Sequence, residues 1–266
     1  MSEERSGVRR FLGHAIWVGL AGGIGSGLFG VGGGVILVPL LTRFFDLSQQ
    51  EAHGTALAVA LFTAPAALIQ YVRTGHVDLA WSLMLAAGSV VGAPLGARWA
   101  HATSEKNLRR AFGLLLLILA VRLSLTHLPE GDLIPEHGVW MIVARVVLGW
   151  IIGVASGYFG VGGGVILVPT LVLLAGLKQV EAQGISLLFV IPTAASGTWK
   201  HRSLGNVKTR EVLPLAVWSI LGAFAAAGVA TRLPSHTLRV CFAVFLFAVG
   251  AKLAFSKTTR SASKAA

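Results

Sequence analysis

Residues 26–41 read SGLFGVGGGVILVPLL, and residues 156–171 read SGYFGVGGGVILVPTL. The two segments lie 130 residues apart and are identical from Gly30 and Gly160 through Pro39 and Pro169. Identity in register over a fixed distance indicates an internal duplication. Each glycine costs a helix about 1 kcal/mol relative to alanine, so the triple glycine predicts a break within a helix in each copy.

The duplication extends well beyond these segments. The same offset pairs Gln49-x-Glu51-Ala52-x-Gly54 with Gln179-x-Glu181-Ala182-x-Gly184, and Leu108-Arg109-x-x-Phe112 with Leu238-Arg239-x-x-Phe242. The polar stretch 126–138 separates the copies and reads as an external loop. The expected organisation is an N-terminal tail at 1–10, membrane repeat 1 at 11–125, the linker at 126–138, membrane repeat 2 at 139–255 and a basic C-terminal tail at 256–266.

Composition places the chain in a membrane. Of the 266 residues, 55% are hydrophobic and only 12% are charged, which exceeds what one water-soluble core can bury. Apolar stretches long enough to cross a bilayer lie at 11–29, 52–72, 79–100, 108–125, 139–159, 182–199, 212–230 and 238–255. Backbone polar groups must be satisfied within each span, and the alternation of barrel strands is absent, so an all-α polytopic membrane protein is predicted.

The distribution of basic residues predicts the orientation. A short apolar piece follows each glycine break, at 35–45 and 165–175, and completes a crossing as half of a broken helix. With these crossings and a cytoplasmic N-terminus, most Lys and Arg residues lie inside, as the positive-inside rule requires. Each repeat then has about four long spans plus a broken half-helix, and the second repeat is inverted relative to the first.

Several function classes are disfavoured. The net charge of +11 comes from residues at span ends and tails, not from a basic stripe with interleaved aromatics, so nucleic-acid binding is not expected. The single Cys241 excludes a disulfide frame, and no histidine pair has metal-ligand spacing. The chain is expected to have no catalytic residues, no metal and no cofactor, and no feature specifies an oligomeric state.

The breaks themselves point to a binding site. Irregular backbone at membrane depth must line a cavity or be buried in protein. Helices that resume at Val35 and Val165 would aim free N–H groups and positive dipole ends at such a cavity, which suits a small oxyanion. The alternative is that the glycines only allow close helix packing, the interpretation preferred for Gly88, Gly92 and Gly96.

Polar residues after each break have two interpretations. Thr55 and Ser186 are candidates for contact with substrate, although hydroxyls in membrane helices often satisfy their own backbone. Ser48 and Glu51 have capping-box spacing, which favours a structural role for Glu51. Because Lys178 occupies the cap position before Glu181, a role for the two glutamates in gating or proton movement stays open.

The repeated Ser-Gly-x-x-Gly-x-Gly-Gly-Gly-x-x-x-Val-Pro element, heading two equivalent multi-span units, resembles the TauE/SafE family of sulfite-exporter-like permeases. The resemblance covers residues 11–255. It implies a secondary transporter for a small anion, such as sulfite, sulfoacetate or another organosulfur anion, in the inner membrane of a bacterial cell. The implied partners are membrane lipid, the anion and a coupling proton or sodium ion, and the direction of transport stays open.

The same resemblance carries the substrate site onto the motif residues. In the first copy these are Ser26, Gly27, Gly30, Gly32, Gly33, Gly34 and Pro39. In the second copy they are Ser156, Gly157, Gly160, Gly162, Gly163, Gly164 and Pro169. The copies differ at Gly25 and Ala155, which makes the two half-sites unequal.

Two other classes of function fit the sequence less well. A structural or assembly partner in the membrane would not need a glycine break in both halves. An intramembrane serine hydrolase would use Ser26 or Ser156 as nucleophile, but the Gly-x-Ser-Gly spacing is missing, since Ile24 and Val154 stand at the first position.

Overall fold

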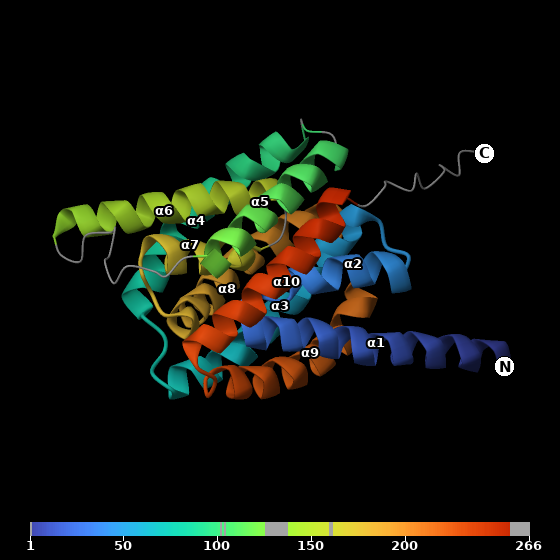
Figure 1. The fold of residues 1–266 in the computed structure, drawn as a ribbon. Coiled ribbons are helices and arrows are strands. Elements are labelled where there is room, and N and C mark those ends of the chain that lie inside the picture. Colours follow the sequence, from blue (N-terminus) through green and yellow to red (C-terminus); the bar gives the residue numbers. More distant parts are fainter. Residues whose placement is uncertain (1, 102, 104, 126–137, 160–161, 256–266) are drawn as a thin grey trace.

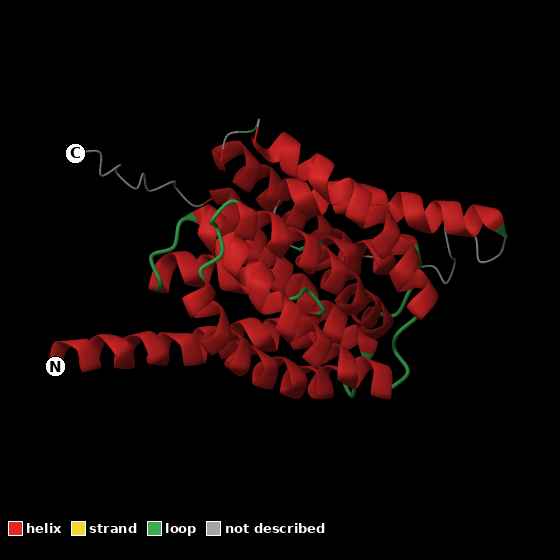
Figure 2. Ribbon diagram, turned by 180° about the vertical axis from the view of Figure 1, so that it is seen from behind, coloured by secondary structure: helices red, strands yellow, loops and turns green. Residues whose placement is uncertain are grey.

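The computed structural model describes residues 2–101, 103, 105–125, 138–159 and 162–255. These residues form ten helices, and no strand is present among them (Figures 1 and 2). The first five helices are α1 (Ser2–Phe29), α2 (Gly34–Phe44), α3 (Gln49–Arg73), α4 (Leu79–His101) and α5 (Glu105–Leu125). The second five are α6 (Val139–Phe159), α7 (Gly164–Leu174), α8 (Gln179–Ser203), α9 (Thr209–Ala230) and α10 (Ser235–Phe255).

The chain is a multi-pass membrane protein. Six helices are long and apolar enough to cross a bilayer, namely α1 from Phe11, α3, α4 to Gly96, α6, α9 and α10. The two other spans expected from the sequence, α5 and α8, form as long helices but are more polar. Three arginines lie in α5, and α8 buries Gln179, Gln183 and Ser186 inside the protein, away from lipid.

Helices of one half pack on helices of the other. α1 lies along α9, α4 along α6 and α5 along α10, while α3 and α8 pack together (Figure 1). Gly88, Gly92 and Gly96 of α4 lie directly on the backbone of α6, which confirms the packing role predicted for them.

The equivalent helices α3 and α8 run antiparallel. Gly54 near the start of α3 lies against the carbonyl of Asn206, just after the end of α8. Gly184 near the start of α8 lies against the carbonyl of His76, just after the end of α3. Each helix therefore begins where its equivalent ends.

The outer surface is apolar. Large hydrophobic side chains that are more than half exposed lie on the outward sides of several helices, among them Leu83, Val91, Ile118, Ile151, Leu221 and Val244. Such a surface is stable in lipid and not in water. Buried polar contacts gather beside the first glycine segment, where Tyr71 contacts the Gly27 carbonyl and Ser186 contacts the Gly30 carbonyl.

Candidate functional site

The first glycine break separates α1 from α2. α1 ends at Phe29 and α2 begins at Gly34, so the predicted interruption is present. Gly30, Gly32 and Gly33 have φ of 67°, 70° and 77°. In this left-handed region any residue with a Cβ is strained, which explains why the segment needs glycine.

The second break repeats this geometry. α6 ends at Phe159 and α7 begins at Gly164, with φ of 76° at Gly162 and 82° at Gly163. Gly160, a predicted site residue, lies outside the described residues. Because Gly33 and Gly163 hold equivalent left-handed conformations directly before a helix, the two helix starts are built alike.

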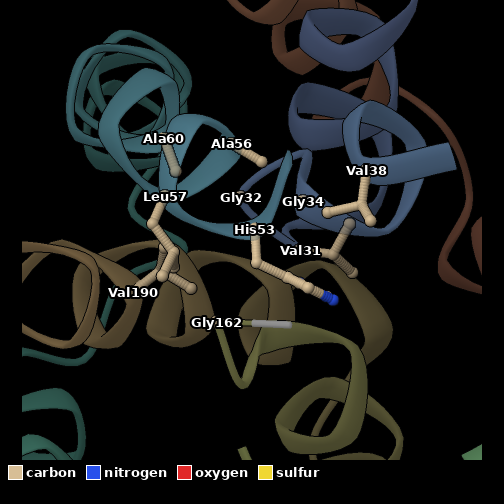
Figure 3. A pocket seen from close by; sticks show the side chains of 10 residues that line it. All are labelled: Val31, Gly32, Gly34, Val38, His53, Ala56, Leu57, Ala60, Gly162 and Val190. Atoms are coloured by element: carbon tan, nitrogen blue, oxygen red, sulfur yellow. The ribbon is translucent and has the colours of Figure 1, made fainter. Parts of the chain in front are cut away.

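The two breaks meet inside the protein. A Cβ added to Gly164, at the start of α7, would lie 2.8 Å from the Val31 Cα and 2.9 Å from the Gly30 carbonyl oxygen. A pocket lies at this junction, lined by Val31, Gly32, Gly34, Val38, His53, Ala56, Leu57, Ala60, Gly162 and Val190 (Figure 3). Both halves of the chain therefore contribute to one space.

The pocket is small and has two helix starts at its border. Its space is about that of one water molecule, so the site must widen before it can hold a larger anion. The first N–H groups of a helix have no partner inside the helix, and the helix dipole adds roughly half a positive charge at that end. The starts of α2 and α7 thus bring donors and positive potential to the junction.

The predicted site residues separate into groups. Gly32, Gly34 and Gly162 line the pocket. Ser26 and Ser156 are buried one turn before each break, and the Ser26 hydroxyl has no hydrogen-bond partner. The remaining motif residues have structural places. Gly27 lets α9 pack closely on α1, Gly157 lets α4 pack closely on α6, and Gly30 packs on Gln183. Gly33 and Gly163 directly precede α2 and α7, and Pro39 and Pro169 lie within those two helices.

Thr55 and Ser186 bind protein groups in this structure. The Ser186 hydroxyl donates to the Gly30 carbonyl at 2.7 Å and is fully buried. The Thr55 hydroxyl accepts a hydrogen bond from the Lys208 backbone N–H at 3.1 Å. Both contacts join the two halves, and the Ser186 bond satisfies a carbonyl that the break removes from helical bonding.

Sequence reasoning did not single out His53, Gln183 or Tyr71. His53 lines the pocket, and Gln183 lies against Gly30 with its Oε1 2.9 Å from the Tyr71 hydroxyl. The same hydroxyl lies 2.9 Å from the Gly27 carbonyl oxygen. Positions 53 and 183 are the variable places in the repeated Glu-Ala-x-Gly pattern, and a polar residue at both was the signal available in the sequence.

The two glutamates cap helices, and only Glu51 forms an ion pair among the described residues. The Ser48–Glu51 capping box is present, which confirms that prediction. The Glu51 carboxylate also lies 2.7 Å from the Lys208 ammonium group, which raises the pKa of Lys208. Glu181 accepts from the Lys178 backbone N–H at 3.3 Å, but a lysine side chain has no acceptor to complete the box.

A buried cation lies apart from the pocket. The Arg145 guanidinium of α6 lies over the Trp81 ring, 3.9 Å from its centroid, and the residue is buried. This cation–π contact joins α6 to α4. Among the described residues no group of three metal-ligating side chains comes together.

Comparison with known proteins agrees with this architecture. The chain is 24% identical over 258 residues to the probable membrane transporter protein YunE of Bacillus subtilis, covering 89% of this chain and 94% of the relative. It is 28% identical over 235 residues to a probable membrane transporter protein of Xylella fastidiosa, covering 85% and 88%. No solved structure matches. A family model described as sulfite exporter TauE/SafE matches residues 2–123 and 136–266, and the chain therefore belongs to this family of membrane transporters.

Proposed function

We propose that the chain is a secondary transporter for a small anion, such as sulfite, sulfoacetate or another organosulfur anion. The observation that carries this proposal is the meeting of the two glycine breaks at one pocket between the halves. The family description supports a sulfur oxyanion as substrate. The names of the relatives support transport without specifying what they carry.

Backbone groups hold the anion in this proposal. No Lys or Arg is among the described residues that line the pocket, whereas Gly34 at the start of α2 and Gly162, two residues before α7, line it. Two helix ends with roughly half a positive charge each compensate about one negative charge. The hydroxyls of Ser26 and Ser156 would add donors when the pocket opens, because they lie one turn before the breaks.

The proposed orientation is inverted repeats with both termini in the cytoplasm of a bacterial cell and the 126–138 linker outside. The antiparallel packing of α3 against α8 supports it, because these helices are equivalent in the duplication. Repeats related in this way can exchange conformations, so that the pocket opens first to one side and then to the other. A proton or sodium gradient, and no ATP hydrolysis by this chain, would drive this exchange.

The geometry around Ser26 favours transport over hydrolysis. A serine nucleophile needs a base within hydrogen-bond reach, and among the described residues the Ser26 hydroxyl has no hydrogen-bond partner. A purely structural membrane protein would not need a glycine break in both halves. These observations support the transporter as the first candidate.

Flux through purified protein in proteoliposomes tests the proposal. Labelled sulfite, thiosulfate and sulfoacetate are supplied with imposed proton or sodium gradients, and empty liposomes serve as the control. We expect saturable flux of at least one of these anions. Absence of protein-dependent flux for all three would contradict the proposed substrate class.

Reporter fusions test the orientation separately. A reporter placed after Lys106 should respond as cytoplasmic, and one placed within residues 126–138 should respond as periplasmic. The opposite pair of results would exclude the proposed topology without affecting the assignment as a transporter.

A further inference from the structure

We propose that His53 is the proton-binding residue of the pocket, so that the anion crosses the membrane together with one proton. This inference rests on the proposed function, because it names the coupling ion of the same site. It concerns a residue outside the repeated glycine motif, on the helix that follows the first break.

His53 has the one side chain with polar atoms among the described residues that line the pocket. It extends from α3 between Val31 of the first break and Gly162 of the second (Figure 3). Around it the walls are glycine backbone and the side chains of valine, alanine and leucine. An ionisable side chain in the interior of a membrane protein is costly there and marks ion or proton pathways.

The equivalent position in the other half holds a side chain that does not titrate. Gln183 is fully buried against Gly30, and its amide oxygen lies beside the Tyr71 hydroxyl. The duplication therefore places a polar residue next to each break but an ionisable one next to only one of them. A structural hydrogen-bonding role alone would be met by glutamine at both positions.

Other charged groups near the start of α3 do not line the pocket. They are Glu51 of α3, His14 of α1, Arg43 of α2, His201 of α8, Lys208 before α9 and Arg210 of α9. Glu51 and Lys208 pair with each other at 2.7 Å. Arg43 and His14 contact the Phe44 ring, and Arg210 contacts the Phe11 ring. His53 is thus the titratable group that an anion in the pocket would meet.

Protonation of His53 suits the pocket to an anion. An imidazole has one N–H donor, whereas an imidazolium has two donors and a positive charge. An anion in apolar surroundings is strongly disfavoured without a compensating charge, and an imidazolium beside the two helix starts supplies it. Because imidazole changes its charge between pH 5 and 8, the proton can be bound on one side of the membrane and released on the other with the anion.

The test follows protons and anion together. Full-length protein is reconstituted with a pH-sensitive dye inside the vesicles, and labelled sulfoacetate is used because its charge is constant between pH 6 and 8. We expect wild-type flux at pH 6 to exceed that at pH 8 by about 25-fold, following the imidazolium fraction of an ordinary histidine, with proton movement in the direction of the anion. His53→Gln, which copies the residue of the second half, should lose proton movement and keep its flux within about twofold over this range.

His236→Gln on the exposed start of α10 is the matched control and should behave as wild type. His53→Asn provides a second variant if the glutamine variant folds poorly. Proton-coupled flux retained in either His53 variant would overturn the inference, as would wild-type sulfoacetate flux without proton movement. Absence of wild-type flux for sulfoacetate, sulfite and thiosulfate would contradict the proposed function, and this inference with it.

Discussion

The two glycine breaks share a left-handed backbone at the two residues before the next helix, but they have different polar neighbours. At the first break, Ser186 donates to the Gly30 carbonyl and Gln183 packs against Gly30. At the positions equivalent to these two residues, the first half has Ala56 and His53, which line the pocket together with Gly162. Duplication kept what the backbone requires, namely glycine at left-handed φ, and allowed the surrounding chemistry to diverge.

The two ends of the α3–α8 pair differ in the same way. Where Gly54 meets the loop after α8, Lys208 forms an ion pair with Glu51. Where Gly184 meets the loop after α3, the equivalent of Lys208 is Asp78, which caps α4 by accepting from the Trp81 N–H at 2.9 Å. The Gly54 end therefore has an ion pair between the halves, from Glu51 to Lys208. The Gly184 end has acidic residues, Glu181 and Asp78, at the two equivalent positions.

The largest effect is expected from removing the shared backbone feature. Gly33→Leu and Gly163→Leu should each abolish transport while the protein still inserts, because leucine is strained at φ near 80° and would contact Gly22 or Phe189. Flux in proteoliposomes, with membrane content measured by immunoblot, checks this. Gly13→Leu, at a helical position with open space around it, is the control. Near-normal flux in both break variants would show that the breaks are not needed.

A smaller effect, on stability, is expected from removing the Ser186 hydroxyl that binds the Gly30 carbonyl at the first break. Ser186→Ala should destabilise the protein by about 1–3 kcal/mol, because it leaves the buried Gly30 carbonyl without a partner. Ser203→Ala, which removes an exposed bond of the same length, should change stability far less. Thermal unfolding in detergent compares the two, and equal melting temperatures would show that the Gly30 carbonyl finds another donor.

The serines one turn before the two breaks should have a similar, moderate effect on anion affinity. Ser26→Ala should weaken apparent anion affinity by about 0.5–1.5 kcal/mol, roughly twofold to tenfold, with little loss of folded protein, because the hydroxyl has no internal partner. Ser156→Ala should weaken affinity to a similar extent if both half-sites contact the anion. Concentration dependence of flux measures both. Affinity that survives both changes but is lost in Arg43→Gln or Lys200→Gln would show that side-chain cations hold the anion.

The smallest effect is expected at the ion pair. Lys208→Gln should lower the melting temperature only slightly, because the pair is partly exposed to solvent. The pKa of Lys208 is raised by Glu51, so its contribution is present below the ordinary value of 10.5 and is lost as pH rises past the raised pKa. The difference between wild type and variant should therefore shrink at strongly alkaline pH. A difference that grows there would contradict this role.

The sequence alone determined the features that depend on local physics. The length of the apolar stretches predicted membrane helices. The triple glycines predicted where two of these helices break, because glycine destabilises a helix at the position where it stands. The Ser48–Glu51 cap and the small-residue face of α4 were also predictable, since both follow from helical spacing. The repeat offset then assigned the same elements to the second half.

Only the tertiary structure decided which residues share the pocket. Gly32 and Gly162, His53 and Val190, and the bonded pair of Ser186 and Gly30 each come from opposite halves of the chain. The depth at which one helix packs on another is set by side-chain shape across that contact, which no local pattern encodes. Likewise the sequence did not show that Thr55, one position before the equivalent of Ser186, binds the Lys208 backbone of the other half. His53 could be named as polar from the sequence, but its place between the breaks follows only from how α3 packs against them.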